Sequence, residues 1–587
     1  MPKSENASKV LDILDTKVNR NFALSASVCV HCGMCTESCH YYVATRDPKM
    51  SPTYKADKVR SLYKRRHDWL SRIVPRWTGA KNLQSDEELD ELMDVVFGSC
   101  TMCRRCTMNC PMGVDTALLM RSARASLCAI GKMPEGVVQV CHDQYETGNQ
   151  MAVSHQDYIE TIEWLSEEHA NDVGDPKAVI PLDKKGADVM YVVNPREVKF
   201  APLTLLAAAK IMYAAGESWT MPSDGWDNTN FGLFAGDDKL GAQMGRRLFE
   251  KAKELRVKKV VVSECGHGFR ATRWEAPNWA KMDLDFPIES FLETMTNYIK
   301  ESRITVDPSR NKARVTYHDP CNLGRSAGLT EEPRFLLQHC VQNFVEMYPN
   351  RADNWCCSGG GGAMSMAEYN SRRIEVARVK ADQLRTTGAK IVATACHNCI
   401  DGLSDLIRKY DLGMKTATVG ELLAEALVMP KALIPEVADM FAAAGIRPIE
   451  LTPGEPRKKI LVIDDEADVR TYLVTLFEDF GYDTIEAPDA NQGMRMIKQY
   501  EPDLITLDII MPKKTGIKLY MELRKEKQYD AIPVIVVTGF AEPEYPNINV
   551  EKFISERRHI RPPEGFIQKP INPVDLMKNV QEAIHAK

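Results

Sequence analysis

The sequence predicts a multidomain chain in three parts: a helical, cysteine-rich module, an α/β middle region, and a doubly wound parallel α/β domain. Three observations predict this fold class. Eight of the 17 cysteines lie in two clusters between Cys29 and Cys110. From Ala187, short runs rich in β-branched residues alternate with helical segments, which is typical of parallel α/β layers. A second alternation of this kind begins at Lys458 and contains no cysteine.

The composition is that of a soluble globular protein. The chain has 587 residues, 44% of them hydrophobic and 27% charged, which is enough for several domains of roughly 150 residues. A net charge of −6 does not suit a general nucleic-acid binder. No run approaches the roughly 20 apolar residues of a spanning helix, and no signal-peptide pattern is present. We expect a cytoplasmic protein whose cysteines are metal ligands or redox groups rather than disulfides.

The N-terminal cysteines repeat one spacing. Cys29-x2-Cys32-x2-Cys35-x3-Cys39 and Cys100-x2-Cys103-x2-Cys106-x3-Cys110 both have the bacterial ferredoxin spacing for cubane [4Fe–4S] clusters. In two-cluster ferredoxins the fourth cysteine ligates the cluster of the other motif. We therefore assign one cluster to Cys29, Cys32, Cys35 and Cys110, and the other to Cys100, Cys103, Cys106 and Cys39. The first motif ends in Cys39-His40 rather than Cys-Pro. The alternative is structural zinc, which usually pairs two C-x2-C knuckles across a longer gap.

The middle region contains an internal duplication. The order FGLFAGDD, a helical stretch and VVVSECGHG matches the order WCCSGGGG, a helical stretch and IVATACHNC. Cys265 aligns with Cys396, whereas Phe231 and Gly232 occupy the places of Cys356 and Cys357. The first copy therefore keeps the framework without most of the thiols.

A second cysteine set consists of Cys321, Cys356-Cys357 and Cys396-x2-Cys399. HDPCNLGR, WCCSGGGGAM and TACHNC resemble the CCG domain of heterodisulfide reductases. Together with the ferredoxin motifs, residues 20 to 430 resemble the D subunit of heterodisulfide reductase, and more closely the K subunit of the Dsr complex and the B subunit of the Tmc complex. The gap of 38 residues between Cys357 and Cys396 is slightly longer than the family's. The glycines from Gly359 to Gly362 allow close backbone approach and supply N–H groups.

The resemblance implies that these five cysteines bind a non-cubane [4Fe–4S] cluster that reduces disulfides. The alternative for Cys356 and Cys357 is a pair of core cysteines. The domains we expect are a two-[4Fe–4S] ferredoxin-type module (1–150), a degenerate first CCG domain (185–300), a CCG cysteine-rich domain (301–445), a linker (446–457) and a final α/β domain (458–587).

The remaining cysteines and three histidines have open roles. Cys128, Cys141 and Cys340 lie in helical contexts and are expected to pack in the core. Cys265 is either a vestigial thiol or a partner near the substrate cluster. His267, His318 and His397 flank the motifs; each is either a proton donor or a neutral structural histidine.

Carboxylates recur at strand ends in the last domain. KKILVIDDEADVR, PDLITLDIIMP, PVIVVTG and GFIQKP each contain a short apolar run that ends at a polar residue, as buried parallel strands do at their carboxyl edge. Asp464 and Asp465 follow the first run and Asp508 another. Three carboxylates at one edge repel unless a hard divalent cation lies among them. The pattern predicts a site for a hard divalent cation.

This last segment resembles the receiver domain of two-component response regulators over its whole length. The resemblance implies Asp508 as phosphoacceptor, Asp464 and Asp465 as the acid pair, and the Ile510 carbonyl as a further Mg²⁺ ligand. It further implies phosphoryl contacts from Thr538 and Lys569, a cis bond at Lys569-Pro570 and a switch aromatic at Phe566. A histidine kinase or another phosphodonor is the implied partner. The alternative is a flavodoxin-like domain without phosphotransfer.

A basic stretch from Val59 to Trp77 interleaves six Arg or Lys residues with apolar side chains. It is either a solvated basic helix or an attachment surface for an acidic or membrane-embedded partner. The resemblance implies a cytochrome b-like or other membrane redox subunit as partner, and attachment to the inner face of the membrane through it.

We expect an iron–sulfur oxidoreductase subunit that passes electrons through two cubane clusters to the CCG-type cluster, where a disulfide or trisulfide of a small thiol protein or thiol cofactor is reduced. The receiver would regulate activity or docking. Two alternatives remain open: a redox-sensing signalling protein, and an electron-transfer subunit of a glycolate or glycerol-3-phosphate dehydrogenase.

Overall fold

The computed structural model describes residues 5–429, 441, 445–447, 449, 457–509, 511, 516–538, 561–569 and 571–585, without the side chains of Asp468, Thr538 and His585. Contacts divide the chain into two units, Met1–Leu433 and Ile434–Lys587. The predictions for Ile510, Pro570 and most of the linker lie outside the described residues, as does the prediction for the Thr538 side chain.

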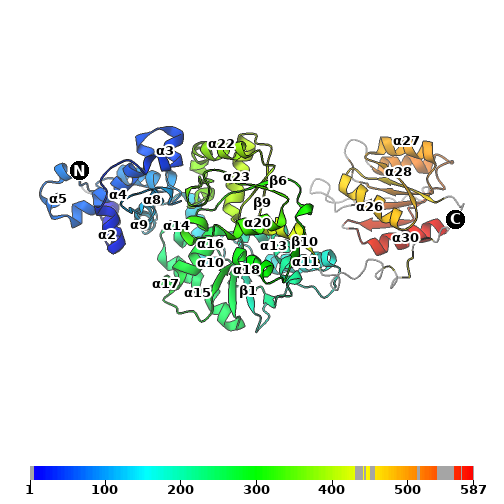
Figure 1. Cartoon of the computed structure of the whole chain (residues 1–587), viewed down its shortest axis with the longest axis horizontal. Helices are drawn as coiled ribbons and strands as arrows, with labels where there is room; N and C mark the ends of the chain where they lie inside the picture. The colour runs from blue at the N-terminus through cyan, green and yellow to red at the C-terminus, as the bar shows by residue number, and fades with distance from the viewer. Residues whose placement is uncertain are drawn as a thin grey trace. The chain divides into compact units, whose positions relative to one another are not determined.

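Helices form the N-terminal part of the first unit (Figure 1). Ser51 caps α4 by accepting the Tyr54 N–H, and Ser154 caps α11 by accepting the Asp157 N–H. Residues of α1, α2, α4, α7, α9 and α10 share one apolar core, and the predicted helical module is confirmed. They are α1 (Glu5–Thr16), α2 (Arg20–Ser27), α3 (His40–Thr45), α4 (Pro52–His67), α5 (Trp69–Ile73), α6 (Pro75–Thr78), α7 (Asp86–Met93), α8 (Arg105–Met108), α9 (Thr116–Cys128), α10 (Glu135–Thr147) and α11 (His155–Val173).

A first α/β layer follows. Four parallel strands, β1 (Val189–Val192), β2 (Trp219–Thr220), β3 (Lys259–Val262) and β4 (Ile288–Ser290), pair in the order β2-β1-β3-β4. The helices between these strands are α12 (Pro195–Lys199), α13 (Pro202–Ala214), α14 (Gly232–Ala235), α15 (Asp238–Leu255), α16 (Gly266–Arg270) and α17 (Ala276–Ala280), and α18 (Phe291–Lys300) follows β4.

A second layer repeats this connectivity. Strands β6 (Arg314–Tyr317), β7 (Asn343–Val345), β8 (Ile391–Ala393) and β9 (Lys415–Ala417) pair in the order β7-β6-β8-β9 and are also parallel. A short antiparallel pair, β5 (Thr305–Val306) and β10 (Leu427–Val428), lies apart from this sheet. The helices are α19 (Gly324–Ala327), α20 (Glu332–Cys340), α21 (Asn370–Val376), α22 (Arg378–Thr387), α23 (His397–Lys409) and α24 (Val419–Ala426). The two layers share one strand order, as an internal duplication predicts.

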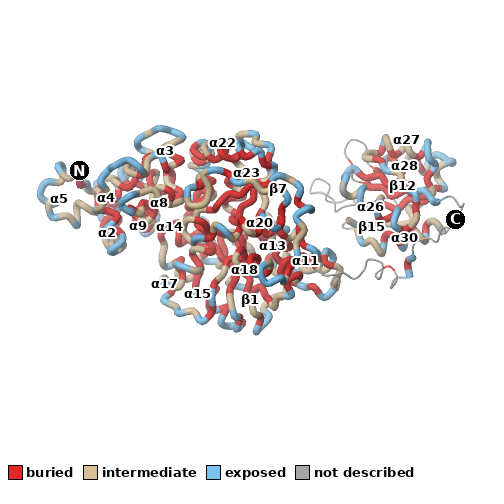
Figure 2. Tube along the Cα trace, in the orientation of Figure 1, coloured by how far each residue is buried: buried red, intermediate tan, exposed pale blue. Residues whose placement is uncertain are grey.

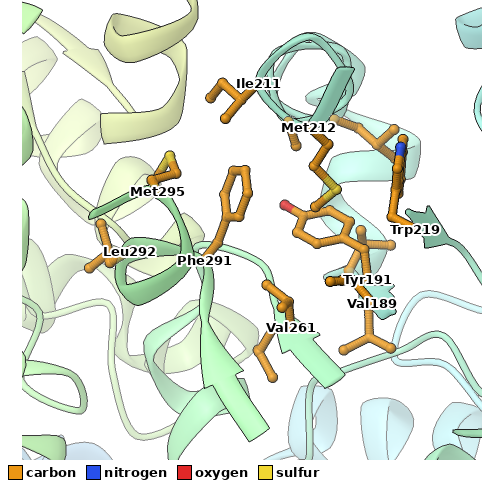
Figure 3. Close-up of a cluster of buried hydrophobic side chains, with 14 of the residues drawn as sticks. Val189, Tyr191, Ile211, Met212, Trp219, Val261, Phe291, Leu292 and Met295 are labelled. Atoms are coloured by element: carbon orange, nitrogen blue, oxygen red, sulfur yellow. The ribbon is translucent and has the colours of Figure 1, made fainter. Parts of the chain in front are cut away.

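One apolar cluster includes residues of both layers. Around β1, Tyr191 packs edge-on against Phe291 with ring centroids 5.2 Å apart, and Met212 lies beside it (Figure 3). Sheet strands are buried, whereas the outer helix α5 exposes much of its surface (Figure 2). The buried core of the first unit therefore includes strand residues of both sheets.

The second unit is a doubly wound parallel sheet. Strands β11 (Lys459–Ile463), β12 (Asp483–Ala487), β13 (Leu504–Leu507), β14 (Val534–Thr538) and β15 (Gly565–Gln568) pair in the order β12-β11-β13-β14-β15. Alternate residues of β11 enter two separate cores, Ile460 and Val462 in one, Leu461 and Ile463 in the other. Both faces are therefore covered, as predicted. The described helices are α26 (Ala467–Asp479), α27 (Ala490–Tyr500), α28 (Gly516–Lys525) and α30 (Pro573–His585).

Among the described residues, no helix combines the length and apolar character that crossing a membrane requires.

Candidate functional site

The first cysteine quartet lines one cavity. Cys29, Cys32 and Cys35 of the first motif meet Cys110 of the second there. Left-handed backbone at His31 (φ 56°) and Gly33 (φ 80°) turns the loop so that its three thiols face inward. Cys32 is exposed, so this cavity lies at the protein surface.

The second quartet lines a neighbouring cavity. Cys100, Cys103 and Cys106 surround it together with Cys39 of the first motif. Burial raises the pKa of Cys106 well above its ordinary value, and the thiolates of Cys103, Cys39 and Cys100 add to the rise. Each cavity thus contains three cysteines of one motif and the last cysteine of the other, and Cys106 lines both cavities. Two-cluster ferredoxins exchange their fourth cysteines in the same way.

The five cysteines of the second set converge at the carboxyl edge of β6 and β8. Cys357 Sγ and Cys399 Sγ lie 3.3 Å apart. Hydrogen bonds with Cys103, Cys321 and Cys357 hold the pKa of the Cys356 thiol well above its usual range. A hydrogen bond from Cys399, aided by the Gly266 N–H, lowers the pKa of Cys396 despite its burial. The structure therefore brings all five together, and four of them are buried.

The glycine run lets backbone approach these sulfur atoms. The Ser358 N–H donates to Cys356 Sγ at 3.3 Å, and the Gly359 N–H donates to Cys357 Sγ at 3.4 Å. A Cβ atom on Gly359 would lie 2.3 Å from the Asn398 carbonyl oxygen, and one on Gly361 (φ 66°) 2.6 Å from that of Thr101. Larger residues would separate the loop from the site.

The five-cysteine site, here called the third or CCG-type site, directly adjoins the second ferredoxin-type site. Ligand atoms of His40, Cys103 and Cys356 all lie within 4.8 Å of one another. Thr101 Oγ1 lies 3.5 Å from Cys356 Sγ. His40 replaces the proline that usually follows the fourth cysteine, so the departure in the first motif lies at the junction of the two sites.

Buried cations surround the second and third sites and have no carboxylate partner in the described part of the chain. Lys55, 2% exposed, donates to Cys39 Sγ at 3.6 Å. Arg124 is 0% exposed and donates to four backbone carbonyls, among them that of Cys100 at 2.7 Å. Lys380 is 0% exposed. Because buried charge is costly without a counter-charge, thiolate-bound anionic clusters fit these residues.

The sequence motifs did not identify these cations. Arg124 lies four residues after Met120 and three before Leu127, and Lys380 lies four before Leu384; the three apolar residues are buried. A cation at helical spacing within an apolar face is the one signal present in the sequence.

Cys265 lies at the rim of the third site. It is buried, accepts a hydrogen bond from Asn194 Nδ2 at 3.4 Å, and its Sγ lies 3.5 Å from His267 Nδ1. Burial raises the Cys265 pKa well above its usual value, and the Cys396 thiolate adds to the rise. Burial lowers the pKa of His267 to about 4, so this ring is neutral.

The two other flanking histidines are buried as well. His318 has its pKa lowered by burial and lies with Cys357 and Cys399 in one group of ligand atoms within 4.8 Å. His397 Nε2 lies 3.3 Å from Glu197 Oε1. Burial alone would lower the His397 pKa, but the Glu197 carboxylate outweighs burial and raises it.

The cysteines outside these sites lie in other surroundings. Cys141 and Cys340 belong to apolar clusters, and burial raises the pKa of each to about 12. Cys128 is half-buried, and burial raises its pKa to about 11.

In the second unit the three predicted carboxylates converge. Ligand atoms of Asp464, Asp465 and Asp508 lie within 4.8 Å of one another. Lys569 Nζ lies 2.9 Å from Asp464 Oδ2 and 2.8 Å from Asp508 Oδ2. Oxygen ligands in this number suit Mg²⁺. Phe566, half-buried, packs against the adjoining apolar cluster.

Comparison with known families gives three matches. Residues 25–114 match the description "4Fe-4S dicluster domain", residues 315–403 match "Cysteine-rich domain", also called CCG, and residues 460–581 match "Response regulator receiver domain".

Several relatives match about two thirds of the chain. The chain is 29% identical over 457 residues to the "Hdr-like menaquinol oxidoreductase iron-sulfur subunit 2" of Archaeoglobus fulgidus, covering 70% of this chain and 81% of that protein. It is 30% identical over 426 residues to the "Hdr-like menaquinol oxidoreductase iron-sulfur subunit" of Archaeoglobus profundus, covering 64% of this chain and 75% of that protein. It is 27% identical over 412 residues to the D subunit of the "Dihydromethanophenazine:CoB--CoM heterodisulfide reductase" of Methanosarcina mazei, covering 68% of this chain and 93% of that protein. The chain belongs to the family of heterodisulfide reductase-like iron–sulfur oxidoreductase subunits, and it carries a response regulator receiver domain in addition.

Proposed function

We propose that this oxidoreductase subunit holds three [4Fe–4S] clusters and reduces a disulfide or trisulfide of a thiol protein or thiol cofactor. When bound, the clusters supply one-electron transfer and, at the CCG-type site, reduction of the sulfur–sulfur bond. Reduction of a disulfide takes two electrons and two protons and releases two thiols. The observation that supports the proposal most is the approach of Cys103 to Cys356 within 4.8 Å.

The three sites differ in their access to solvent, and this difference suggests a direction. Cys32 of the first quartet is exposed, the second quartet is half-buried, and four of the five CCG-type cysteines are buried. We propose that a redox partner docks near Cys32 and that the sulfur substrate meets the chain at Cys321, the half-buried member of the last set.

The relatives suggest a class of electron donor. Two of them are named as menaquinol oxidoreductase subunits. We propose that this chain likewise receives electrons from a membrane redox subunit, of cytochrome b type as the family resemblance implies, and works at the inner face of the membrane through that partner.

The receiver domain supplies regulation. Asp508 is the proposed phosphoacceptor, with Mg²⁺ held by Asp464 and Asp465, and Lys569 already lies at hydrogen-bond distance from the acceptor carboxylate. A histidine kinase or another phosphodonor is the partner this arrangement requires.

The test uses full-length protein purified without oxygen and reduced with a low-potential dye. We expect wild type to reduce a small disulfide, and Cys357→Ser to lose that activity while both ferredoxin-type clusters remain. Cys128→Ser, which removes a half-buried thiol outside the sites, is the matched control and should react as wild type does. Equal disulfide reduction by wild type and Cys357→Ser would refute the proposed role of the third site.

A further inference from the structure

Lys380 on α22 is completely buried, and no carboxylate in the described part of the chain forms an ion pair with it. Its Nζ donates to Asn354 Oδ1 at 2.5 Å and to Gln383 Oε1, and lies 3.3 Å from Met347 Sδ. All three are neutral groups, and no described carboxylate pairs with this ammonium. Burial lowers the Lys380 pKa to about 7, while Asp319 and the Cys357 thiolate oppose that change. Since Arg334 already pairs with Asp319, the other negative groups that act on Lys380 are the thiolates of Cys357 and Cys356.

The first α/β layer supports this interpretation by contrast. Helices α15 and α22 both end at a left-handed residue, Arg256 and Gly388. Eight residues before these caps lie Leu248 and Lys380, and both are buried. The first layer, which lacks most of the thiols, thus has apolar Leu248 at the position where the second layer has the cation Lys380. Packing alone does not require a charge at this position.

A hydrogen-bond chain leads from Lys380 to the site. An ammonium has only donors, so the Asn354 oxygen must face Lys380 and the Asn354 amide N–H must face His318. Asn354 Nδ2 lies 3.1 Å from His318 Nδ1. His318 Nδ1 is therefore the acceptor, and the neutral ring carries its proton on Nε2. Ligand atoms of His318, Cys357 and Cys399 lie within 4.8 Å of one another.

We propose that Lys380 is a positioning residue for the CCG-type site: it supplies positive charge to that site and, through Asn354, directs the His318 Nε2–H toward Cys357. Both effects stabilise the more negative, reduced state of a cluster bound there. Lys380 therefore raises the reduction potential of that site relative to the ferredoxin-type sites and favours electron arrival where the substrate is reduced. This inference rests on the proposed function.

Lys55 provides a matched control at the neighbouring site. It too is buried without a carboxylate partner in the described part of the chain, and its Nζ lies 3.6 Å from Cys39 Sγ and 4.6 Å from the centroid of the Tyr41 ring. Its charge acts on the second ferredoxin-type site. Lys55→Met and Lys380→Met remove the same charge with the same change in shape from two different sites.

The experiment is a redox titration of full-length, anaerobically purified protein followed by electron paramagnetic resonance, with iron content measured in every variant. Lys380→Met should lower the potential of the CCG-type signal and leave both ferredoxin-type signals in place. Lys55→Met should lower the potential of one ferredoxin-type signal and leave the CCG-type signal unchanged. Lys380→Gln, which keeps a polar side chain without the charge, should behave as Lys380→Met does.

The outcomes distinguish a failure of the proposed role of Lys380 from a failure of the proposed function. If wild type holds the third cluster and either Lys380 variant with full iron content shows its signal at the wild-type potential, the role of Lys380 is refuted and the proposed function stands. A parallel shift of all three signals would also refute it, because a specific charge acts mainly on its neighbour. If wild type holds no third cluster, both the inference and the proposed function fail.

Discussion

Sulfur atoms in this chain lie in two kinds of surroundings. At the proposed sites they accept backbone hydrogen bonds, as Cys100 does from the Met102 N–H and Cys110 from the Val114 N–H, both at 3.4 Å. Cys141 instead lies among hydrocarbon side chains. N–H donors stabilise a thiolate and a cluster bound to it, whereas hydrocarbon disfavours the charged form. This difference separates the proposed ligands from the packing cysteines.

Local spacing explains why the ligand sets were predictable and their neighbours were not. In C-x2-C-x2-C a single loop determines where three thiols lie, so its sequence is enough. The approach of Cys103 to Cys356 joins residues far apart in the chain and depends on how the helical region packs against the α/β layers. The role of Lys380 depends on the same packing. No local pattern reveals the approach of Cys103 to Cys356, and the helical spacing that marks Lys380 does not identify the group it faces.

At the residue scale, the buried side chain of Glu264 leads to a prediction about how stability depends on pH. Its two carboxylate oxygens accept the Val419 and Gly420 N–H groups at 2.9 and 2.8 Å. Burial raises its pKa to about 8, with Glu421 adding to the rise and the two N–H groups and His397 opposing it. The folded state therefore holds a proton that the unfolded state releases near pH 4.5.

Because the pKa of Glu264 is higher in the folded state, its contribution to the free energy of unfolding is complete below about pH 4.5 and is lost as the pH rises through about 8. We expect the free energy of unfolding of wild type to fall more steeply with pH in this window than that of Glu264→Gln, by up to about 1.4 kcal/mol per pH unit. Urea unfolding followed by circular dichroism measures both slopes. Parallel pH profiles for the two proteins would contradict the prediction.

At the scale of elements, the first α/β layer supports the site of the second. Its Glu264 carboxyl group accepts two N–H groups at the N-terminus of α24, and its Gly266 N–H donates to Cys396. A Cβ atom on Gly266 would lie 3.5 Å from Pro320, beside Cys321. Alternation of strands and helices predicted both layers, and the matching strand orders agree with the predicted duplication. What the degenerate copy contributes is a framework around the other copy's cysteines.

The short helices α5 and α6 carry an exposed apolar surface. Trp69 is 72% exposed, Ile73 69% and Trp77 81%, and α5 lies at the outer end of the helical region (Figure 1). The neighbouring basic residues are not equivalent. Arg66 binds Asp12 and Asp15, so it stabilises the fold, whereas Arg72 is exposed.

We therefore expect the double variant Trp69→Ser, Trp77→Ser to reduce the share of the protein that sediments with membranes severalfold, because interfacial tryptophans anchor such contacts. Trp164→Ser, at another exposed tryptophan on α11, is the control. Iron content checks that each variant is folded. Membrane fractionation equal to that of wild type would count against an attachment surface on α5 and α6.

At the scale of the whole molecule, an oxidoreductase unit is joined to a receiver unit in one chain. Phosphorylation of Asp508 would add about two negative charges beside Lys569, which now contacts Asp464, Glu466 and Asp508. Drawing Lys569 to the phosphoryl group would release Glu466 and change that surface. The parallel sheet was predictable from its apolar runs, whereas the sharing of Lys569 by three carboxylates is a property of the folded edge.

Treatment with a small phosphodonor and Mg²⁺ should change disulfide reduction or partner binding by wild type and leave Asp508→Asn unaffected. The cluster signals themselves should stay as they are. Phosphate incorporation at Asp508 measures modification, and the reductase assay measures its effect. If wild type incorporates phosphate while activity, partner affinity and oligomeric state are all unchanged, the receiver does not regulate this chain.

The number of iron atoms bound per chain tests the central claim most directly. Thirteen cysteines form three sets around three sites, so full-length protein purified without oxygen should bind about twelve iron atoms, four in each cluster. Cys357→Ser should bind about eight. A wild-type content of about eight, equal to that of Cys357→Ser, would show that the CCG-type site holds no cluster and would contradict the account.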